Sequence, residues 1–193
     1  MKTRGLIALV MLAVPILAGP ASAGILRDYA GKPDDSYKYA IHSTLPVQQC
    51  TAYIVRMTSQ TWRGLVWNHW MAIFKPENVK FPGKSMLFIG CGDNTDEAPD
   101  LRDQESQVLA MIAGHTQAVV ARIWQVPNQP LFDGKYEDAI IAYTFERFGR
   151  GEGDDWPLLL PMVKSAVRAM DTVQSVAREK WDQDIKQFMV TGA

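Results

Sequence analysis

The sequence is short of cysteine, of excess charge and of long apolar stretches, and each shortage excludes a class of protein. Its 193 residues include only two cysteines, Cys50 and Cys91, which are too few for a disulfide framework. A net charge of −1 argues against nucleic acid as a partner, because binding phosphate requires a net basic face. No group of His, Cys, Asp and Glu residues has the spacing of metal ligands, so we expect neither a metal nor another cofactor.

The one long apolar run stands at the start of the chain. Two positive charges precede the apolar residues 6–18, and Ala21-Ser22-Ala23 then gives the small-x-small pattern that signal peptidase recognises. These features predict a secretory signal over residues 1–23 and an exported protein, periplasmic or secreted, over residues 24–193. An uncleaved membrane anchor is the alternative, but the run is short for a span of about 20 residues. No later stretch reaches that length, so we expect no membrane span after cleavage.

The residues after the signal begin with a pattern typical of antiparallel strands. The chain is 47% apolar and 21% charged, which fits one globular domain with its own core. Three segments rich in β-branched and aromatic residues, with short polar connections, predict strands at residues 37–41, 52–57 and 67–74. The polar residues 58–60 are expected to end the second of these strands.

Strands and helices alternate in the second part of the chain. Three apolar runs predict further strands, the first buried on both faces, at residues 86–89, 118–123 and 185–190. Apolar residues at helical spacing predict three helices, at residues 100–113, 137–148 and 158–180. Gly114 follows the first helix in the usual C-terminal position. The alternation requires a parallel sheet with right-handed crossovers, so the expected fold class is α/β.

Two loops at the ends of predicted strands contain candidate site residues. Gly90, Cys91 and Gly92 follow a buried strand and precede a helix, where a glycine-rich loop can direct backbone N–H groups at developing negative charge. An ordinary turn is the simpler interpretation of the same residues. Asn128 and Gln129 also follow a strand of the parallel sheet, where ligands gather. They either line the rim of a site or form a structural turn.

The last predicted strand leads into Gly192 and Ala193, and a strand that runs into Gly-x begins the Gly-x-Ser-x-Gly nucleophile elbow of serine hydrolases. A triad in the order Ser, Asp, His places its histidine late in the chain, and none of the three histidines lies there. His42 is expected to end the first strand, His69 to be packed and hydrogen-bonded, and His115 to lie in a turn. Cys50 and Cys91 either pair with each other or remain buried thiols.

Five segments resemble a known family. They are MTSQTW at 57–62, FIGCGDN at 88–94, VPNQPL at 126–131, EDAIIAYT at 137–144, and WP at 156–157 with LPMVKSAVRAMD at 160–171. In these segments the chain resembles the PhoPQ-activated pathogenicity-related protein family, whose members resemble secreted α/β-hydrolases. The family usually has glycine where this chain has Cys91, whose side chain narrows the oxyanion loop or shifts its N–H groups.

The resemblance implies an α/β-hydrolase fold in which Gly192 and Ala193 are the first two residues of a Gly-Ala-Ser-Lys-Arg-Gly elbow. On that basis residues 24–193 are an incomplete α/β-hydrolase-like domain, the N-terminal half of the fold truncated at the elbow. We then expect the chain to lack the catalytic serine, acid and histidine, and to be inactive alone towards an ester or peptide substrate of unknown identity. The alternative is a non-catalytic exported binding protein on the same scaffold that self-associates through its last strand.

Overall fold

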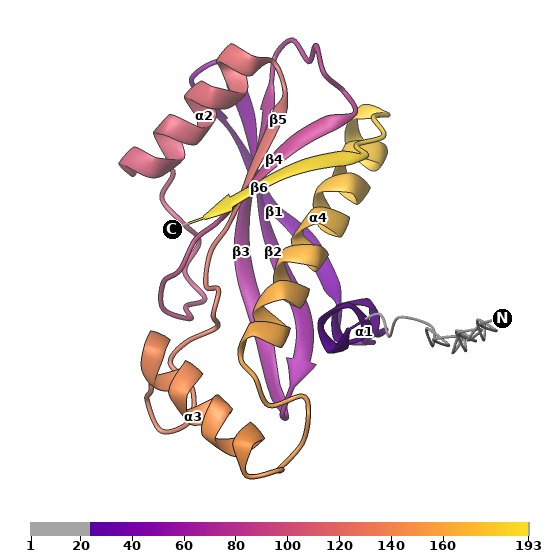
Figure 1. The fold of residues 1–193 in the computed structure, drawn as a ribbon. Helices are drawn as coiled ribbons and strands as arrows, with labels where there is room; N and C mark the ends of the chain where they lie inside the picture. The colour runs from indigo at the N-terminus through magenta and orange to yellow at the C-terminus, as the bar shows by residue number, and fades with distance from the viewer. Residues whose placement is uncertain (1–23, 193) are drawn as a thin grey trace, which may run out of the picture.

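Six strands of the computed structural model, which describes residues 24–192, lie in one mixed sheet in the order β1-β2-β3-β5-β4-β6 (Figure 1). The strands are β1 (Lys38–Val47), β2 (Cys50–Trp62), β3 (Leu65–Pro76), β4 (Lys84–Ile89), β5 (Val119–Ile123) and β6 (Gln187–Gly192). The first three pair antiparallel, whereas β5, β4 and β6 pair in parallel. Both halves of the predicted pattern are therefore confirmed, and the antiparallel pair β3–β5 joins them.

The prediction that residues 58–60 end the second strand is wrong, because β2 continues beyond them. Ser59 and Gln60 are fully buried, and their polar atoms have partners inside the fold. Ser59 Oγ lies 3.0 Å from Ser165 Oγ, and Gln60 Nε2 donates to the Pro161 carbonyl at 2.7 Å. Polar side chains that are hydrogen-bonded can be buried at little cost, so polarity alone does not mark the end of a strand.

The helices are α1 (Ile25–Gly31), α2 (Gln104–Thr116), α3 (Glu137–Gly149) and α4 (Leu159–Trp181). The last two match their predictions to within one residue, but α2 starts and ends later than predicted. The side chain of Asp103 caps its start by accepting from Ser106 N at 3.0 Å. Gly114 lies inside the helix instead of closing it, because Gln117, with φ of 53°, takes the left-handed position at the C-terminus.

Helices α2 and α4 cover opposite faces of the sheet. Between the sheet and α4 lies one core, which includes Val55, Ile73, Leu87, Ala169 and Val173. Between the sheet and α2 lies a second core, which includes Ile54, Phe74, Leu109, Ala110 and Ala113. Since α2 packs over β2, β3 and β5, the end of the sheet formed by β4 and β6 has little cover on that side.

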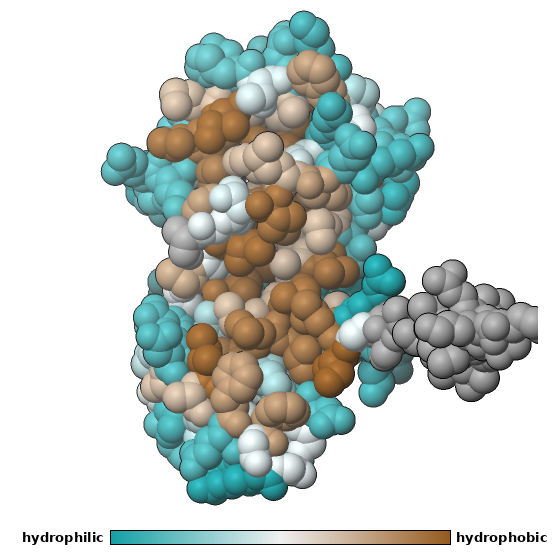
Figure 2. Space-filling view, in the orientation of Figure 1, coloured by the Kyte–Doolittle hydropathy of each residue, from teal (hydrophilic) through white to brown (hydrophobic). Residues whose placement is uncertain are grey.

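The prediction that β4 is buried on both faces is therefore only half right. Leu87 is fully buried towards α4, but Met86 and Phe88 on the other face are half-buried. On the neighbouring edge strand β6, Met189 and Val190 are 68% and 48% exposed. Figure 2 shows the resulting apolar surface in the middle of the molecule, where β6 crosses the view of Figure 1.

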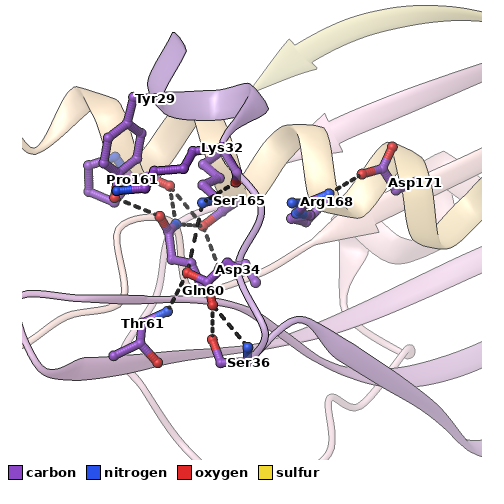
Figure 3. Close-up of polar contacts among 12 residues, drawn as sticks. Tyr29, Lys32, Asp34, Ser36, Gln60, Thr61, Pro161, Ser165, Arg168 and Asp171 are labelled. Carbon is purple, nitrogen blue, oxygen red and sulfur yellow. Dashed lines mark hydrogen bonds and ion pairs between the residues drawn. The ribbon is translucent and has the colours of Figure 1, made fainter. Parts of the chain in front are cut away.

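The short helix α1 is attached to the sheet and to α4 by polar contacts (Figure 3). Tyr29 Oη donates to Gln60 Oε1 at 2.9 Å, and Asp34 accepts from the backbone N–H of Thr61 at 3.1 Å. Lys164 Nζ donates to the Lys32 carbonyl at 2.9 Å and lies 3.8 Å from Asp34 Oδ2. Residues 25–34 are thus held in place by β2 and α4, although the sequence pattern predicts no element there.

The predicted signal segment, residues 1–23, lies outside the described residues. None of the helices within residues 24–192 is long and apolar enough to cross a membrane.

Candidate functional site

The ends of β4 and β6 lie next to each other, and this brings two of the predicted site segments together. Ile89 and Gly192 are partners in the parallel pairing of these strands. The approach is very close, since a Cβ on Gly192 would stand 2.6 Å from the Ile89 carbonyl oxygen. Gly90 directly follows Ile89, so the predicted oxyanion loop begins beside the predicted start of the elbow. Ala193, the second predicted elbow residue, lies outside the described residues.

The loop Gly90-Cys91-Gly92 has two backbone N–H groups available for a ligand. The N–H of Gly90 donates to the Ile123 carbonyl at 2.8 Å, so it cannot also bind an oxyanion. The N–H groups of Cys91 and Gly92 have no acceptor among the described residues. Gly92 has φ of +115°, a backbone conformation that L side chains rarely adopt, and a Cβ there would meet open space. Paired free N–H groups of this kind are what stabilisation of an oxyanion requires.

Asn128 and Gln129 support this loop from inside the protein. They are only 2% and 3% exposed. Asn128 Nδ2 donates to the Asn68 carbonyl at 2.6 Å, and its Oδ1 accepts from Asn94 Nδ2 at 3.1 Å. Gln129 accepts from Asn94 N with its carbonyl at 2.6 Å and from Glu137 N with its Oε1 at 3.0 Å. Of the two interpretations offered by the sequence, these contacts favour the structural turn, which positions the loop after β4.

Gln125 makes similar contacts but is not among the residues predicted from sequence. It is 2% exposed and accepts from Trp70 N with its Oε1 at 3.0 Å. Its Nε2 donates to the carbonyls of Asp93 and Thr95 at 3.3 Å and 3.0 Å. A polar residue between a buried strand and a proline is the only signal in the sequence that could have indicated this role. Gln125 fixes the backbone immediately after the candidate oxyanion loop.

A pocket of about 430 Å³ opens beside this loop, between residues 91–100 and the start of α2. Its lining includes Trp70, Cys91, Gly92, Asp93, Arg122 and Trp124. Arg122 is 8% exposed, pairs with Asp103 at 2.9 Å and with Glu105, and lies 4.3 Å from the centre of the Trp124 ring. Partial burial alone would raise the pKa of Asp103, but hydrogen bonds from Ser106 and Arg122 lower it overall.

His69 makes the one Ser–His contact among the described residues, but substrate cannot reach it. Its ring is completely buried, with Nδ1 donating to the Trp124 carbonyl at 3.1 Å and Nε2 lying 3.0 Å from Ser59 Oγ. Burial lowers the pKa of His69 to about 4, so the ring is neutral at pH 7. The prediction of a packed, hydrogen-bonded residue agrees with this arrangement. A general base needs access to its substrate, which His69 lacks.

The positions predicted for the other two histidines are wrong. His42 lies in the middle of β1, not at its end, with its ring edge-on to Trp70 at 5.2 Å between centroids. His115 belongs to the last turn of α2, because the helix continues past Gly114, and its Nδ1 lies 2.9 Å from the Met111 carbonyl. Neither residue lines the pocket beside the candidate oxyanion loop.

The two cysteines are not paired with each other. Cys50 is buried against α2, where its Sγ donates to the Ala110 carbonyl at 3.4 Å and burial raises the pKa of the thiol. Cys91 is exposed in the candidate oxyanion loop. Within residues 24–192, no group of three or more His, Cys, Asp or Glu side chains is arranged to hold a metal ion.

The fold has counterparts among known proteins. The chain is similar to a glucuronoyl esterase from Solibacter usitatus, with 14% identity and a TM-score of 0.51 over 87% of this chain and 50% of that one. It is also similar to a candidate acetyl xylan esterase from Bacteroides fragilis, with 11% identity and a TM-score of 0.52 over 86% and 43% of the two chains. At these identities the likeness shows the fold, which is of the α/β-hydrolase type.

Sequence similarity extends over almost the whole chain. It is 32% identical to autocrine proliferation repressor protein A of Dictyostelium discoideum over 197 residues, which cover 96% of this chain and 39% of that protein. The chain therefore spans about two fifths of the length of this curated relative. The model of the PhoPQ-activated pathogenicity-related protein family matches residues 26–193. The chain belongs to the PhoPQ-activated pathogenicity-related protein family.

Proposed function

We propose that these residues form the oxyanion-binding half of an exported α/β-hydrolase that cleaves ester bonds. The observation that supports this most directly is the contact between Gly192 and Ile89, the residue before the candidate oxyanion loop. In the proposed arrangement Gly192 begins the nucleophile elbow, and the unpaired N–H groups of Cys91 and Gly92 lie close to it. Attack of a nucleophile on an ester carbonyl places negative charge on its oxygen, and two preorganised N–H groups stabilise that charge. The predicted signal at residues 1–23 supports the proposal of export.

The nucleophile, acid and histidine of the triad would come from sequence that corresponds to the remainder of the longer relatives. The chain contains no Gly-x-Ser-x-Gly motif, and Ser59 and His69 are buried away from the pocket. In an α/β-hydrolase the nucleophile stands on a sharp turn between a strand and a helix. In the proposed arrangement β6 is that strand. We therefore propose that residues 24–193 alone do not hydrolyse esters. The esterase names of the two structural neighbours favour an ester over a peptide bond as the substrate.

Two assays test this function. One is labelling by a fluorophosphonate, which reacts with activated serines, and the other is hydrolysis of p-nitrophenyl acetate. Two samples are compared: recombinant residues 24–193, and the native exported protein recovered with an antibody against these residues. The antibody retains any polypeptide that continues or joins the chain. We expect labelling and hydrolysis only in the native sample. Hydrolysis by the recombinant chain at the native rate, or by neither sample, contradicts the proposal.

A second candidate, a non-catalytic binding protein, is favoured by the exposed edge strand β6. Met189 and Val190 are exposed on its two faces, and no strand within residues 24–192 pairs with its outer edge. Such an edge is prone to pair with another copy. Sedimentation of residues 24–193 distinguishes the candidates, since a discrete dimer that disappears on substituting Val190→Lys supports self-association as the function. A polydisperse aggregate supports the hydrolase proposal, in which these residues need further polypeptide to cover β6.

A further inference from the structure

We propose that the pocket between residues 91–100 and the start of α2 binds a neutral, hydroxyl-rich group, such as one glycosyl unit of a carbohydrate. The pocket adjoins Cys91 and Gly92, so the bound unit would lie next to an ester held at the candidate oxyanion loop. Its volume, about 430 Å³, is within the usual range of small-molecule sites. Only the use of the bound group as part of a substrate depends on the proposed esterase function.

The pocket has hydrogen-bond acceptors that lack donors. Among the described residues, the carboxylates of Asp93 and Glu97 have no hydrogen-bond or ion-pair partner. The other two acids of the lining are already neutralised, because Asp100 pairs with Arg102 and Asp103 with Arg122. The excess negative charge disfavours an anionic ligand, since like charges brought together without compensation repel each other.

Residues that line the same pocket also have buried donors without acceptors. Trp70 is 5% exposed and lines the pocket, and its indole Nε1–H has no acceptor within residues 24–192. A buried donor without a partner is costly and therefore unusual. The Nε–H of Arg122, which also lines the pocket, is buried and likewise has no acceptor in that part of the chain. A cationic ammonium ligand could pair with the carboxylates, but it has no lone pair to offer these donors.

Hydroxyl groups satisfy both requirements, because each can donate to a carboxylate and accept from an N–H. The half-buried ring of Trp124 adds an apolar wall against which the C–H face of a sugar ring can pack. The guanidinium of Arg122 lies 4.3 Å from the centre of that ring and fixes its position. A neutral sugar therefore matches the pocket better than a uronate or an ammonium compound.

Calorimetric titration of the purified chain with three probes tests the proposal without requiring any catalysis. The probes are xylotriose, which is neutral, trigalacturonic acid, which is anionic, and choline, which is cationic. We expect saturable binding of xylotriose and at least about tenfold weaker binding of the other two. Trp124→Ala should abolish xylotriose binding. The double variant Asp93→Asn, Glu97→Gln should weaken xylotriose binding and reduce the preference for xylotriose over trigalacturonic acid.

Two substitutions far from the pocket, Asp138→Asn and Glu179→Gln, are matched controls and should leave binding unchanged. Circular dichroism of every variant establishes that each is folded before it is titrated. The proposal is overturned if xylotriose does not bind saturably, if choline or trigalacturonic acid binds as tightly, or if the control variants lose binding equally. Failure of the esterase function is detected separately, by the absence of fluorophosphonate labelling from a protein that still binds xylotriose.

Discussion

Gly192 packs so closely against Ile89 that a Cβ added to the glycine would stand 2.6 Å from the Ile89 carbonyl oxygen. No real Cβ occupies such a position, so the strands can keep this register only with glycine at 192. Because the candidate oxyanion loop starts at Gly90, this contact fixes the distance between the loop and the residue that begins the proposed elbow. The proposed function therefore depends on this close approach between the two strands.

Substitution of Gly192→Val should separate the end of β6 from β4. Overpacking of this kind costs about 1–3 kcal/mol, which corresponds to roughly 5- to 160-fold faster amide exchange in residues 189–192. Hydrogen exchange followed by NMR measures this directly. Thr191→Val is the control, because this side chain is exposed and its replacement should leave exchange unchanged. Equal protection in the Gly192→Val variant would show that the contact does not hold the strand.

Protonation of His69 should make the stability of the chain depend on pH. Its pKa is 6.5 when unfolded and about 4 in the fold, so the unfolded chain binds more protons between these values. Stability should be fully present above pH 6.5 and fall by about 3 kcal/mol as pH decreases towards 4. Urea unfolding at several pH values measures this loss. In His69→Gln the dependence in this window should largely disappear, and an unchanged slope would assign it to other groups.

Arg122 should stabilise the start of α2 through its contacts with Asp103, Glu105 and Ser106. Arg122→Met removes charged hydrogen bonds worth about 2–3 kcal/mol and leaves Asp103 without its cation. Urea denaturation should detect this loss, together with a rise in the lowered pKa of Asp103 measured by NMR. Arg102→Met is the control: Arg102 is exposed, and its loss should not change the unfolding midpoint. Equal midpoints for the two variants would show that the contacts of Arg122 do not stabilise the start of α2.

Lys164 should hold the N-terminal segment against α4. Burial lowers the pKa of its ammonium group, and Lys164→Met removes its bond to the Lys32 carbonyl while keeping the aliphatic packing. We expect a loss of about 1 kcal/mol and faster amide exchange confined to residues 25–36. The exposed Lys180→Met is the comparison and should have no such effect. Faster exchange throughout the sheet would instead indicate a role in the whole core.

Local sequence patterns predicted the strands and the three long helices, because apolar periodicity reflects which face each element buries. They failed where a tertiary contact or the conformation of a neighbouring residue determines where an element ends. Residues 58–60 continue β2 because α4 and β3 supply their partners, and Gly114 stays helical because Gln117 adopts the left-handed conformation. The candidate loop was predicted from its glycines. The pocket, the supporting role of Gln125 and the use of the Gly90 N–H by Ile123 depend on tertiary contacts that no spacing reveals.

The esterase activity of the native exported protein carrying Gly92→Val tests the central claim most directly. The matched control is Gly151→Val, since both glycines have positive φ and open space at the Cβ position, but Gly151 lies in the loop between α3 and α4. Valine keeps the backbone N–H, but it strains the positive-φ conformation at position 92 and should displace that N–H. If the Gly92 N–H stabilises the oxyanion, Gly92→Val should therefore lower kcat by about 100-fold or more with little change in KM. The Gly151→Val protein should keep the parent kcat. Equal kcat values for the two variants would contradict the account.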